Sequence, residues 1–374
     1  MFNWALHKGR LLMALSCVVG RSGFLAAAAP PASAQFKAWV MAKLPEIPWG
    51  MGVDSKGNIY TSLPRIGEVV VLKDDGTYDH IAWVPSKEES GKDGIGLAGL
   101  DKADNIYVFD KAHSRYEGED STNPFHPACR DATATRTGIY KIDAKTRRVT
   151  ALATKADGWP FCFPHGVAVD SNGNVYMADI TYSAIWKISP DGKKVDLWSA
   201  HPLLNWPPSP YSGVFFDSEV YLGVSAIAID KQQKNIYAVT MGVPMVLRIP
   251  IKEDGSAGEP KPLQPSGHSL LDAVLLDPRG NIYVSEMLRN EIWVLSPDGS
   301  QRILIANKMN APLDTNTGLV LKGDVLCTSN SGFAHIVHSK PEEADRTVVC
   351  MKGFPLPNGP AHLPWGRSDL RRFR

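Results

Sequence analysis

The sequence predicts an all-β protein: a six-bladed β-propeller with four antiparallel strands per blade. Three observations support this prediction. One four-strand unit can be read six times along the chain, Asp-Gly turn signals follow the third strand in four of the six units, and no helical hydrophobic period of useful length follows residue 34. Six blades of this kind close a ring without long exposed sheet edges.

The core of each unit is an Asn-apolar-Tyr triplet. A short apolar strand that ends at Asp and a turn precede the triplet, which opens a second strand rich in β-branched and aromatic residues. The triplets begin at Asn58, Asn105, Asn174, Asn235 and Asn281, with a degenerate copy at Asp324. Third strands are expected at 68–72, 138–142, 184–188, 245–249, 291–295 and 334–337.

Fourth strands complete the units, as at 194–198 and 302–305. Residues 36–44 precede the first unit and read as a strand, so we expect them to close the ring by pairing into the last blade. Two insertions, at about 112–136 and 200–222, interrupt the regular spacing. Loops this long are usually functional or disordered, and the aromatic content of the second favours a functional role.

The N-terminus reads as a secretory signal over residues 1–34. Basic residues precede an apolar run, and Ala32-Ser33-Ala34 forms an A-x-A cleavage site. The alternative is a retained membrane anchor, but Arg21 ends the run short of the roughly 20 residues that a span needs. We therefore expect a secreted or periplasmic protein without a membrane span in the mature chain. Residues 35–352 form the propeller and 353–374 a C-terminal tail.

Composition excludes several classes of function. The chain has 374 residues, 44% of them hydrophobic, and a formal net charge of +1, so nothing indicates a nucleic-acid or anionic-membrane partner. It contains no P-loop, dinucleotide fingerprint, HExxH motif or EF-hand loop. A small molecule is the expected partner.

Four cysteines lie beyond the signal segment, and export permits disulfides. Cys129 and Cys162 fall in irregular segments, whereas Cys327 and Cys350 fall in the last sheet. These are the preferred pairs, and buried free thiols are the alternative. No C-x-x-C spacing suggests zinc.

The unit PHGVAVDSNGNVYMADITYSAIWKISPDG, residues 164–192, resembles a blade of the gluconolactonase/regucalcin-like propellers and of the related NHL-type repeats. A second similarity is to the yellow/major royal jelly proteins. It lies in YLGVSAIAIDKQQKNIYAV, residues 221–239, and in the cysteine-bearing insertion after NIYVFD, residues 105–110. The resemblance covers about residues 36–340.

The resemblance implies a divalent metal ion in the central channel. Its ligands would lie just before the Gly of each first strand, where this chain has Trp49, Ile95, His165, Ser225, Asp272 and Thr317. Only Asp272 matches the ligand type of the family, which offers Glu, Asn and Asp. Calcium or zinc held by His165 and Asp272 is therefore the metal expectation, with an incomplete ligand set.

The same ring of positions supplies the candidate site. His165 is the expected general base, oriented or charged by Asp272; the alternative is that both bind buried water. Trp49, Ile95, Ser225 and Thr317 are candidates for substrate binding, with core packing as the alternative for Trp49. Ser225 lacks the G-x-S-x-G context of a nucleophile.

Two further carboxylates end second strands and are candidates for acid/base chemistry, Asp179 and Glu286. Their alternatives are turn capping by Asp179 and a salt bridge between Glu286 and Arg289. The expected function is hydrolysis of a lactone or ester in the channel. The alternatives are a ligand- or protein-binding propeller with an aromatic patch at 206–216, and an isomerase or ring-forming enzyme on the same scaffold.

Overall fold

The computed structural model describes residues 35–87, 94–111, 136–204, 222–265, 270–332, 335 and 340–357. All of them belong to the unit Gln35–Arg374. Of the two predicted insertions, only residues 136, 200–204 and 222 fall within these ranges, and Cys129 lies outside them. Among the described residues, no helix has the length and apolarity needed to cross a membrane.

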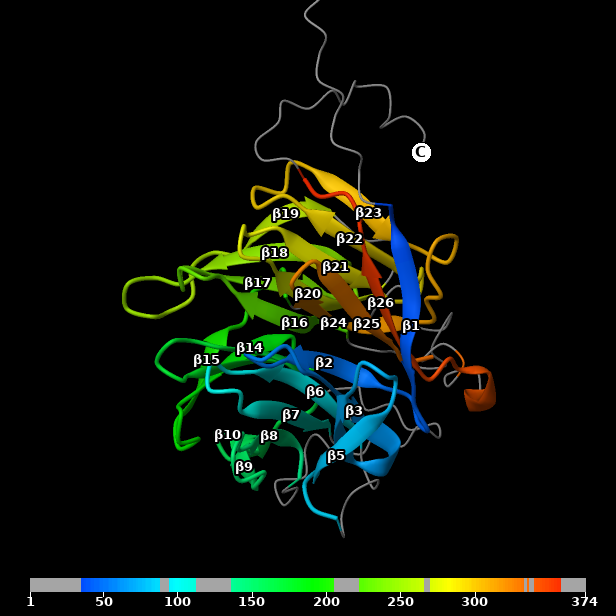
Figure 1. The fold of residues 1–374 in the computed structure, drawn as a ribbon. Helices are drawn as coiled ribbons and strands as arrows, with labels where there is room; N and C mark the ends of the chain where they lie inside the picture. The colour runs from blue at the N-terminus through cyan, green and yellow to red at the C-terminus, as the bar shows by residue number, and fades with distance from the viewer. Residues whose placement is uncertain are drawn as a thin grey trace, which may run out of the picture. The chain divides into compact units, whose positions relative to one another are not determined.

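Six four-stranded antiparallel sheets make up the fold, which confirms the predicted propeller (Figure 1). The first three blades consist of β2 (Trp49–Val53), β3 (Ile59–Leu63), β4 (Glu68–Leu72) and β5 (Tyr78–Trp83); β6 (Gly94–Leu100), β7 (Ile106–Lys111), β8 (Gly138–Ile142) and β9 (Val149–Ala153); and β12 (Pro164–Val169), β13 (Val175–Asp179), β14 (Ala184–Ile188) and β15 (Val195–Ser199).

The last three blades consist of β16 (Val224–Ile229), β17 (Asn235–Thr240), β18 (Met245–Pro250) and β19 (Lys261–Pro265); β20 (Leu271–Leu276), β21 (Ile282–Glu286), β22 (Glu291–Leu295) and β23 (Arg302–Ala306); and β24 (Asn316–Lys322), β25 (Val325–Asn330), β26 (Thr347–Lys352) and β1 (Lys37–Lys43). A hairpin of β10 (Lys155–Ala156) and β11 (Trp159–Pro160) and two 3-10 turns, η1 (Pro64–Ile66) and η2 (Pro341–Glu343), complete the described elements.

The first strand of each blade lies innermost, and neighbouring inner strands contact one another around the ring. The contacts run from β2 to β6, β12, β16, β20 and β24, and β24 returns to β2. The N-terminal strand β1 pairs antiparallel with β26, Lys37 opposite Lys352, as the outermost strand of the sixth blade. The predicted ring closure is therefore confirmed.

The repeated Asp-Asn-Tyr pattern builds the turn between the first two strands. Asp54 accepts hydrogen bonds from the backbone N–H groups of Lys56 and Asn58, the Asn58 amide and the Tyr60 hydroxyl. Asp101 and Asp277 bind the Asn and Tyr of their own units in the same way. Because each Asp satisfies the backbone donors of its turn, the motif fixes the hairpin and recurs with the blades.

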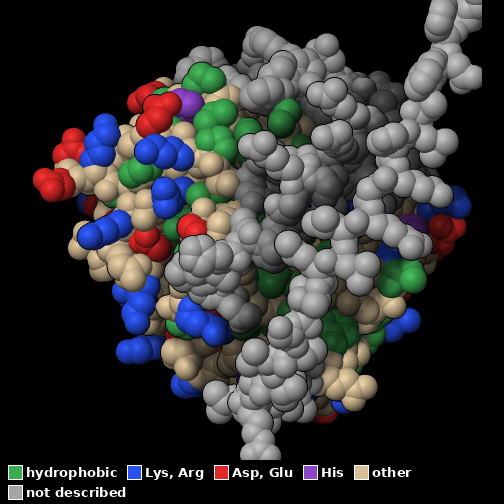
Figure 2. Space-filling view, turned by 90° about the horizontal axis from the view of Figure 1, so that it is seen from above, with side chains coloured by type: hydrophobic (Ala, Val, Ile, Leu, Met, Phe, Trp, Pro, Cys, Tyr) green, Lys and Arg blue, Asp and Glu red, His purple; other side chains and the backbone are tan. Residues whose placement is uncertain are grey.

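Apolar side chains fill the spaces between adjacent blades. One such cluster joins Tyr60 and Val69 of the first blade to Leu97, Val108 and Tyr140 of the second. On the outside, basic and acidic side chains alternate over the described part of the face in Figure 2. The mixed charge agrees with the net charge of the sequence.

One predicted strand was wrong. The third strand of the sixth blade is β26, which pairs with β25, and not residues 334–337. Of that segment only His335 is described, and it is not in a strand. The cysteines of β25 and β26 lie directly opposite each other and form the predicted Cys327–Cys350 disulfide. Cys162 is also disulfide-bonded.

Candidate active site

The inner strands surround a cavity of about 70 Å³ on the ring axis. Four side chains that line it come from four blades: Trp49 of β2, Phe109 of β7, His165 of β12 and Asp272 of β20. All four are almost completely buried. The structure therefore brings together His165, Asp272 and Trp49, which the repeat placed at equivalent positions, and adds Phe109.

His165 has a defined tautomer. Its Nδ1 lies 2.9 Å from the carbonyl oxygen of Ser225. A carbonyl only accepts, so Nδ1 carries the proton and donates it, and Nε2 presents its lone pair. That Nε2 lies 3.7 Å from Oδ1 of Asp272. Neither atom has a hydrogen-bond partner among the described residues, and buried polar atoms of this kind mark a place for water or ligand.

Burial sets the protonation states of the pair. It lowers the pKa of His165 to about 3, and the positive charge of Lys111 acts in the same direction, against the hydrogen bond to Ser225. Burial also raises the pKa of Asp272 to about 7, partly offset by Lys111. His165 is therefore neutral near pH 7, and its contact with Asp272 is not an ion pair. Of the two, Asp272 is the stronger base.

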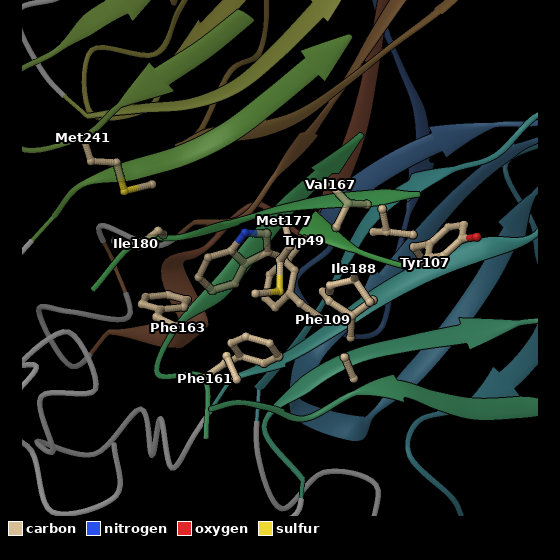
Figure 3. Packing of buried hydrophobic residues seen from close by; sticks show 14 of the residues in the cluster. Trp49, Tyr107, Phe109, Phe161, Phe163, Val167, Met177, Ile180, Ile188 and Met241 are labelled. Carbon is tan, nitrogen blue, oxygen red and sulfur yellow. The ribbon is translucent and has the colours of Figure 1, made fainter. Parts of the chain in front are cut away.

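Three aromatic rings pack against His165. Figure 3 shows these rings, Trp49, Phe109 and Phe163, within one buried cluster. Phe109 stacks on the imidazole with ring centroids 4.7 Å apart, and Trp49 and Phe163 meet it edge-on at 6.0 and 5.9 Å. Phe109 has room because Gly96 faces its ring, and a Cβ at that position would overlap the ring. These rings keep bulk water from the His165–Asp272 pair.

Lys111 lies next to the cavity lining, against Trp49, and sequence reasoning missed it. It ends β7 with its side chain buried, and its Nζ lies 4.6 Å from the ring centroids of both Trp49 and Phe163. Burial lowers the pKa of Lys111 to about 7, against the attraction of Asp272 and, more weakly, of Asp110. An alignment of the six units would have shown it. Lys111 lies six residues after Asn105, and the equivalent residues of the other units are uncharged: Pro64, Ile180, Met241, Met287 and Asn330.

Three other predicted ring residues do not place a side chain in the cavity. Ile95 packs in the apolar cluster between the first two blades, because β6 pairs Gly96 with Phe109 and carries its bulge after Leu97. Ser225 directs its hydroxyl to the carbonyl of Leu271, 2.7 Å away, and offers His165 only its backbone. The Thr317 hydroxyl lies 3.0 Å from that of Ser329.

Asp179 lies outside the cavity lining. Its buried carboxylate accepts backbone hydrogen bonds at 3.0–3.2 Å from Cys162, Phe163, Thr181 and Tyr182. Burial raises the pKa of Asp179 to about 6, against these four bonds. The contacts match the turn-capping alternative: Asp179 ties the segment before β12 to the end of β13.

Glu286 is also buried outside the cavity lining. Its Oε2 accepts from the Trp293 indole at 3.3 Å and lies 3.6 Å from Arg302. Its Oε1 lies 3.9 Å from Arg289. The expected ion pair with Arg289 is present, and the contacts assign Glu286 a structural role between β21, β22 and β23.

The residues at the cavity do not fit a divalent metal ion. Calcium takes about six to eight oxygen ligands and zinc about four ligands. Among the residues that line the cavity, His165 and Asp272 are the only ones with a side chain that can bind such an ion, and apolar residues and glycines form the rest of the lining. Among the described residues, no group of three or more His, Cys, Asp or Glu side chains is placed to hold a metal.

Comparison with known proteins identifies one NHL repeat, at residues 161–184, while no curated protein sequence matches the chain. Similar solved structures include a gluconolactonase from Xanthomonas campestris (TM-score 0.58, 12% identity, 86% of this chain and 90% of that chain). A second is regucalcin, a calcium-binding protein from Agrobacterium tumefaciens (0.53, 13%, 85% and 94%). A third is an auxiliary nutrient binding protein from Bacteroides ovatus (0.56, 12%, 84% and 76%). The chain therefore has the six-bladed propeller fold of the gluconolactonase and regucalcin structures.

Proposed function

We propose that this protein is an exported hydrolase that cleaves a lactone or ester at the central cavity. The observation that carries the proposal is the buried His165–Asp272 pair, whose Nε2 and Oδ1 face each other 3.7 Å apart without hydrogen-bond partners among the described residues. The likeness in fold to a gluconolactonase supports this class of reaction. Export rests on the signal-like residues 1–34.

The pair is arranged to hold a water molecule. With Nδ1 bonded to Ser225, Nε2 is an acceptor, and ionised Asp272 is a second acceptor. A water in the cavity donates one hydrogen to each and keeps its oxygen lone pairs for attack. A cavity of about 70 Å³ accommodates this water and the reacting carbonyl group, since one water needs roughly 10–15 Å³.

The reaction proceeds by base-assisted addition. Asp272 accepts a proton as the water oxygen bonds to the carbonyl carbon and the C=O electron pair moves to oxygen. When the tetrahedral species collapses, the C–O bond to the leaving group breaks and the proton on Asp272 passes to the departing oxygen. The products are a carboxylic acid and an alcohol, joined in one molecule for a lactone. Asp272 is the base here and His165 positions the water, which reverses the expected roles because the pKa of Asp272 is the higher.

The test is a screen of lactones and aryl esters with wild type, Asp272→Asn and His165→Gln. We expect kcat to fall by about 100-fold or more in both variants, the range typical of lost acid–base groups. His80→Gln is the matched control, because His80 contacts the carboxylate of Glu68 at 2.8 Å outside the cavity. Wild-type turnover in Asp272→Asn would exclude this mechanism, whereas no turnover of any lactone or ester by wild type would favour a binding propeller.

A further inference from the structure

We propose that the ammonium group of Lys111, and not a divalent metal ion, supplies the positive charge that stabilises the substrate oxygen at the central cavity. The catalytic part of this inference rests on the proposed hydrolysis. The part that excludes a divalent metal ion concerns the protein itself and can be tested without a substrate.

The Lys111 ammonium group lies against two aromatic rings that also contact His165. The Nζ of Lys111 lies 4.6 Å from the ring of Trp49 and 4.6 Å from the ring of Phe163. Both rings meet the imidazole of His165 edge-on. The ammonium therefore belongs to the same aromatic cluster as the His165–Asp272 pair, and the faces of the two rings favour a cation there.

Charged groups on neighbouring strands favour a positive charge at Lys111. Asp272 on β20 attracts the Lys111 ammonium most strongly, followed by Asp110, which precedes it on β7 and lies 3.4 Å from Arg136. His165 on β12 is neutral near pH 7 and is disfavoured as a cation by Lys111. Lys111 is also the charge that opposes the raised pKa of Asp272. Among the described residues, Lys111 is thus the cation that offsets the charge of Asp272.

A divalent ion at the same place is unfavourable for two reasons. A doubly charged ion beside the Lys111 ammonium would suffer like-charge repulsion in a site shielded from solvent. The atoms that would compensate are Nε2 of His165 and Oδ1 of Asp272, fewer than calcium or zinc takes. Lys111 brings one positive charge and hydrogen-bond donors without needing a ligand cage.

The chemistry requires such a charge. Addition of water to the carbonyl places negative charge on the substrate oxygen, and an ammonium group stabilises it electrostatically. In metal-dependent hydrolysis the ion has this task. In this mechanism the Asp272 carboxylate acts as the base, and the Lys111 ammonium stabilises the negative charge on the substrate oxygen.

The first test needs no substrate. Wild-type protein treated with a chelator is titrated with Ca²⁺ and, separately, with Zn²⁺ by isothermal titration calorimetry, and the untreated protein is analysed for bound metals. We expect no stoichiometric binding in either measurement. One equivalent of metal that binds wild type and is lost in Asp272→Asn would overturn the inference.

The second test measures hydrolysis. Lys111→Met should lower kcat by about 100- to 1,000-fold, as loss of a group that stabilises an oxyanion does, whereas chelators should leave the wild-type rate unchanged. Lys111→Arg should retain part of the rate and move the alkaline limb of the pH–rate profile upward, because guanidinium stays charged. Lys141→Met is the matched control, since the Lys141 Nζ lies over Tyr107 at 5.6 Å outside the cavity.

Wild-type kcat in Lys111→Met, or inactivation of wild type by chelators, would overturn the inference. If Lys111→Met does not fold, Lys111→Arg decides the question, because an alkaline limb at the wild-type pH would overturn the inference. If wild type hydrolyses no lactone or ester, the proposed function fails, and the titration still decides whether the cavity binds a metal.

Discussion

Asp179 and Asp272 show how two buried carboxylates can share a raised pKa and differ in role. Burial is the main cause for both. Asp179 accepts four backbone hydrogen bonds, whereas Oδ1 of Asp272 has no partner among the described residues. The raised pKa alone therefore does not identify a catalytic group; the hydrogen-bond partners do.

This difference predicts the result of replacing Asp179 by Asn. One carboxylate oxygen becomes an NH₂ group, so at least one buried backbone N–H, such as that of Cys162, loses its acceptor. We expect the free energy of unfolding to fall by about 1–3 kcal/mol, the cost of an unsatisfied buried donor. Urea denaturation measures it, and an unchanged midpoint would mean that the turn before β12 does not depend on this carboxylate.

At the scale of single residues, the repeat located part of the site. His165 and Asp272 could be predicted because they are polar where the repeat turns toward the ring axis. Ile95 was misplaced because the bulge of β6 follows Leu97, whereas in β2 it lies next to Trp49, and no local signal marks the shift. Phe109 and Lys111 depend on side-chain packing between blades, which spacing along one chain does not reveal.

At the scale of elements, the sixth blade departs from the sequence prediction. Residues 334–337, Ala-His-Ile-Val, have the composition of a strand, yet β26 begins at Thr347, after the turn η2. The cysteines indicate the position of the third strand better than the apolar pattern does, because Cys327 and Cys350 are opposite residues of β25 and β26. A disulfide partner thus marks a strand that propensity alone misses.

The Cys327–Cys350 bond should stabilise this blade. The two cysteines are 23 residues apart, and closing a loop of that size is worth about 3 kcal/mol in the chain-entropy account. We expect the double variant Cys327→Ala/Cys350→Ala to lose about that much in the free energy of unfolding, as measured by guanidinium denaturation. If the single variant Cys327→Ala loses far more unfolding free energy than the double variant, the unpaired Cys350 thiol, and not the loss of the bond, would be the main cause of destabilisation.

At the scale of the whole molecule, the number of blades and the closure of the ring could be predicted. The Asp-Asn-Tyr turn recurs because each copy satisfies its own backbone, so the blade count could be read from one local motif. The closing role of residues 36–44 followed from the lack of any other place for a strand before the first unit. The segment between β25 and β26 and the two insertions follow no repeat, so their structure could not be predicted from the repeated motif.

The global stability should depend on pH in an unusual way. Relative to ordinary values of 3.8 and 10.5, burial raises the pKa of Asp272 to about 7 and lowers that of Lys111 to about 7. Between pH 4 and 7 the folded protein binds more protons at Asp272 than the unfolded chain does, so stability falls as pH rises. Between pH 7 and 10 it binds fewer at Lys111, so stability rises again.

The difference in unfolding free energy between wild type and Lys111→Met/Asp272→Asn isolates this contribution. We expect the free energy of unfolding of wild type minus that of the double variant, measured by urea denaturation from pH 4 to 10, to pass through a minimum near pH 7. A difference that is flat over this range would show that the two groups are not buried as charges in solution.

The pairing of β1 with β26 has a consequence for the order of folding. Lys37 lies opposite Lys352, so β1 has no partner until β26 has been made. The loop that this contact closes spans all six blades, which makes its closure slow relative to the hairpins within each blade. Refolding should therefore populate an open arc of formed blades, with exposed edges on the first and last, before the ring locks.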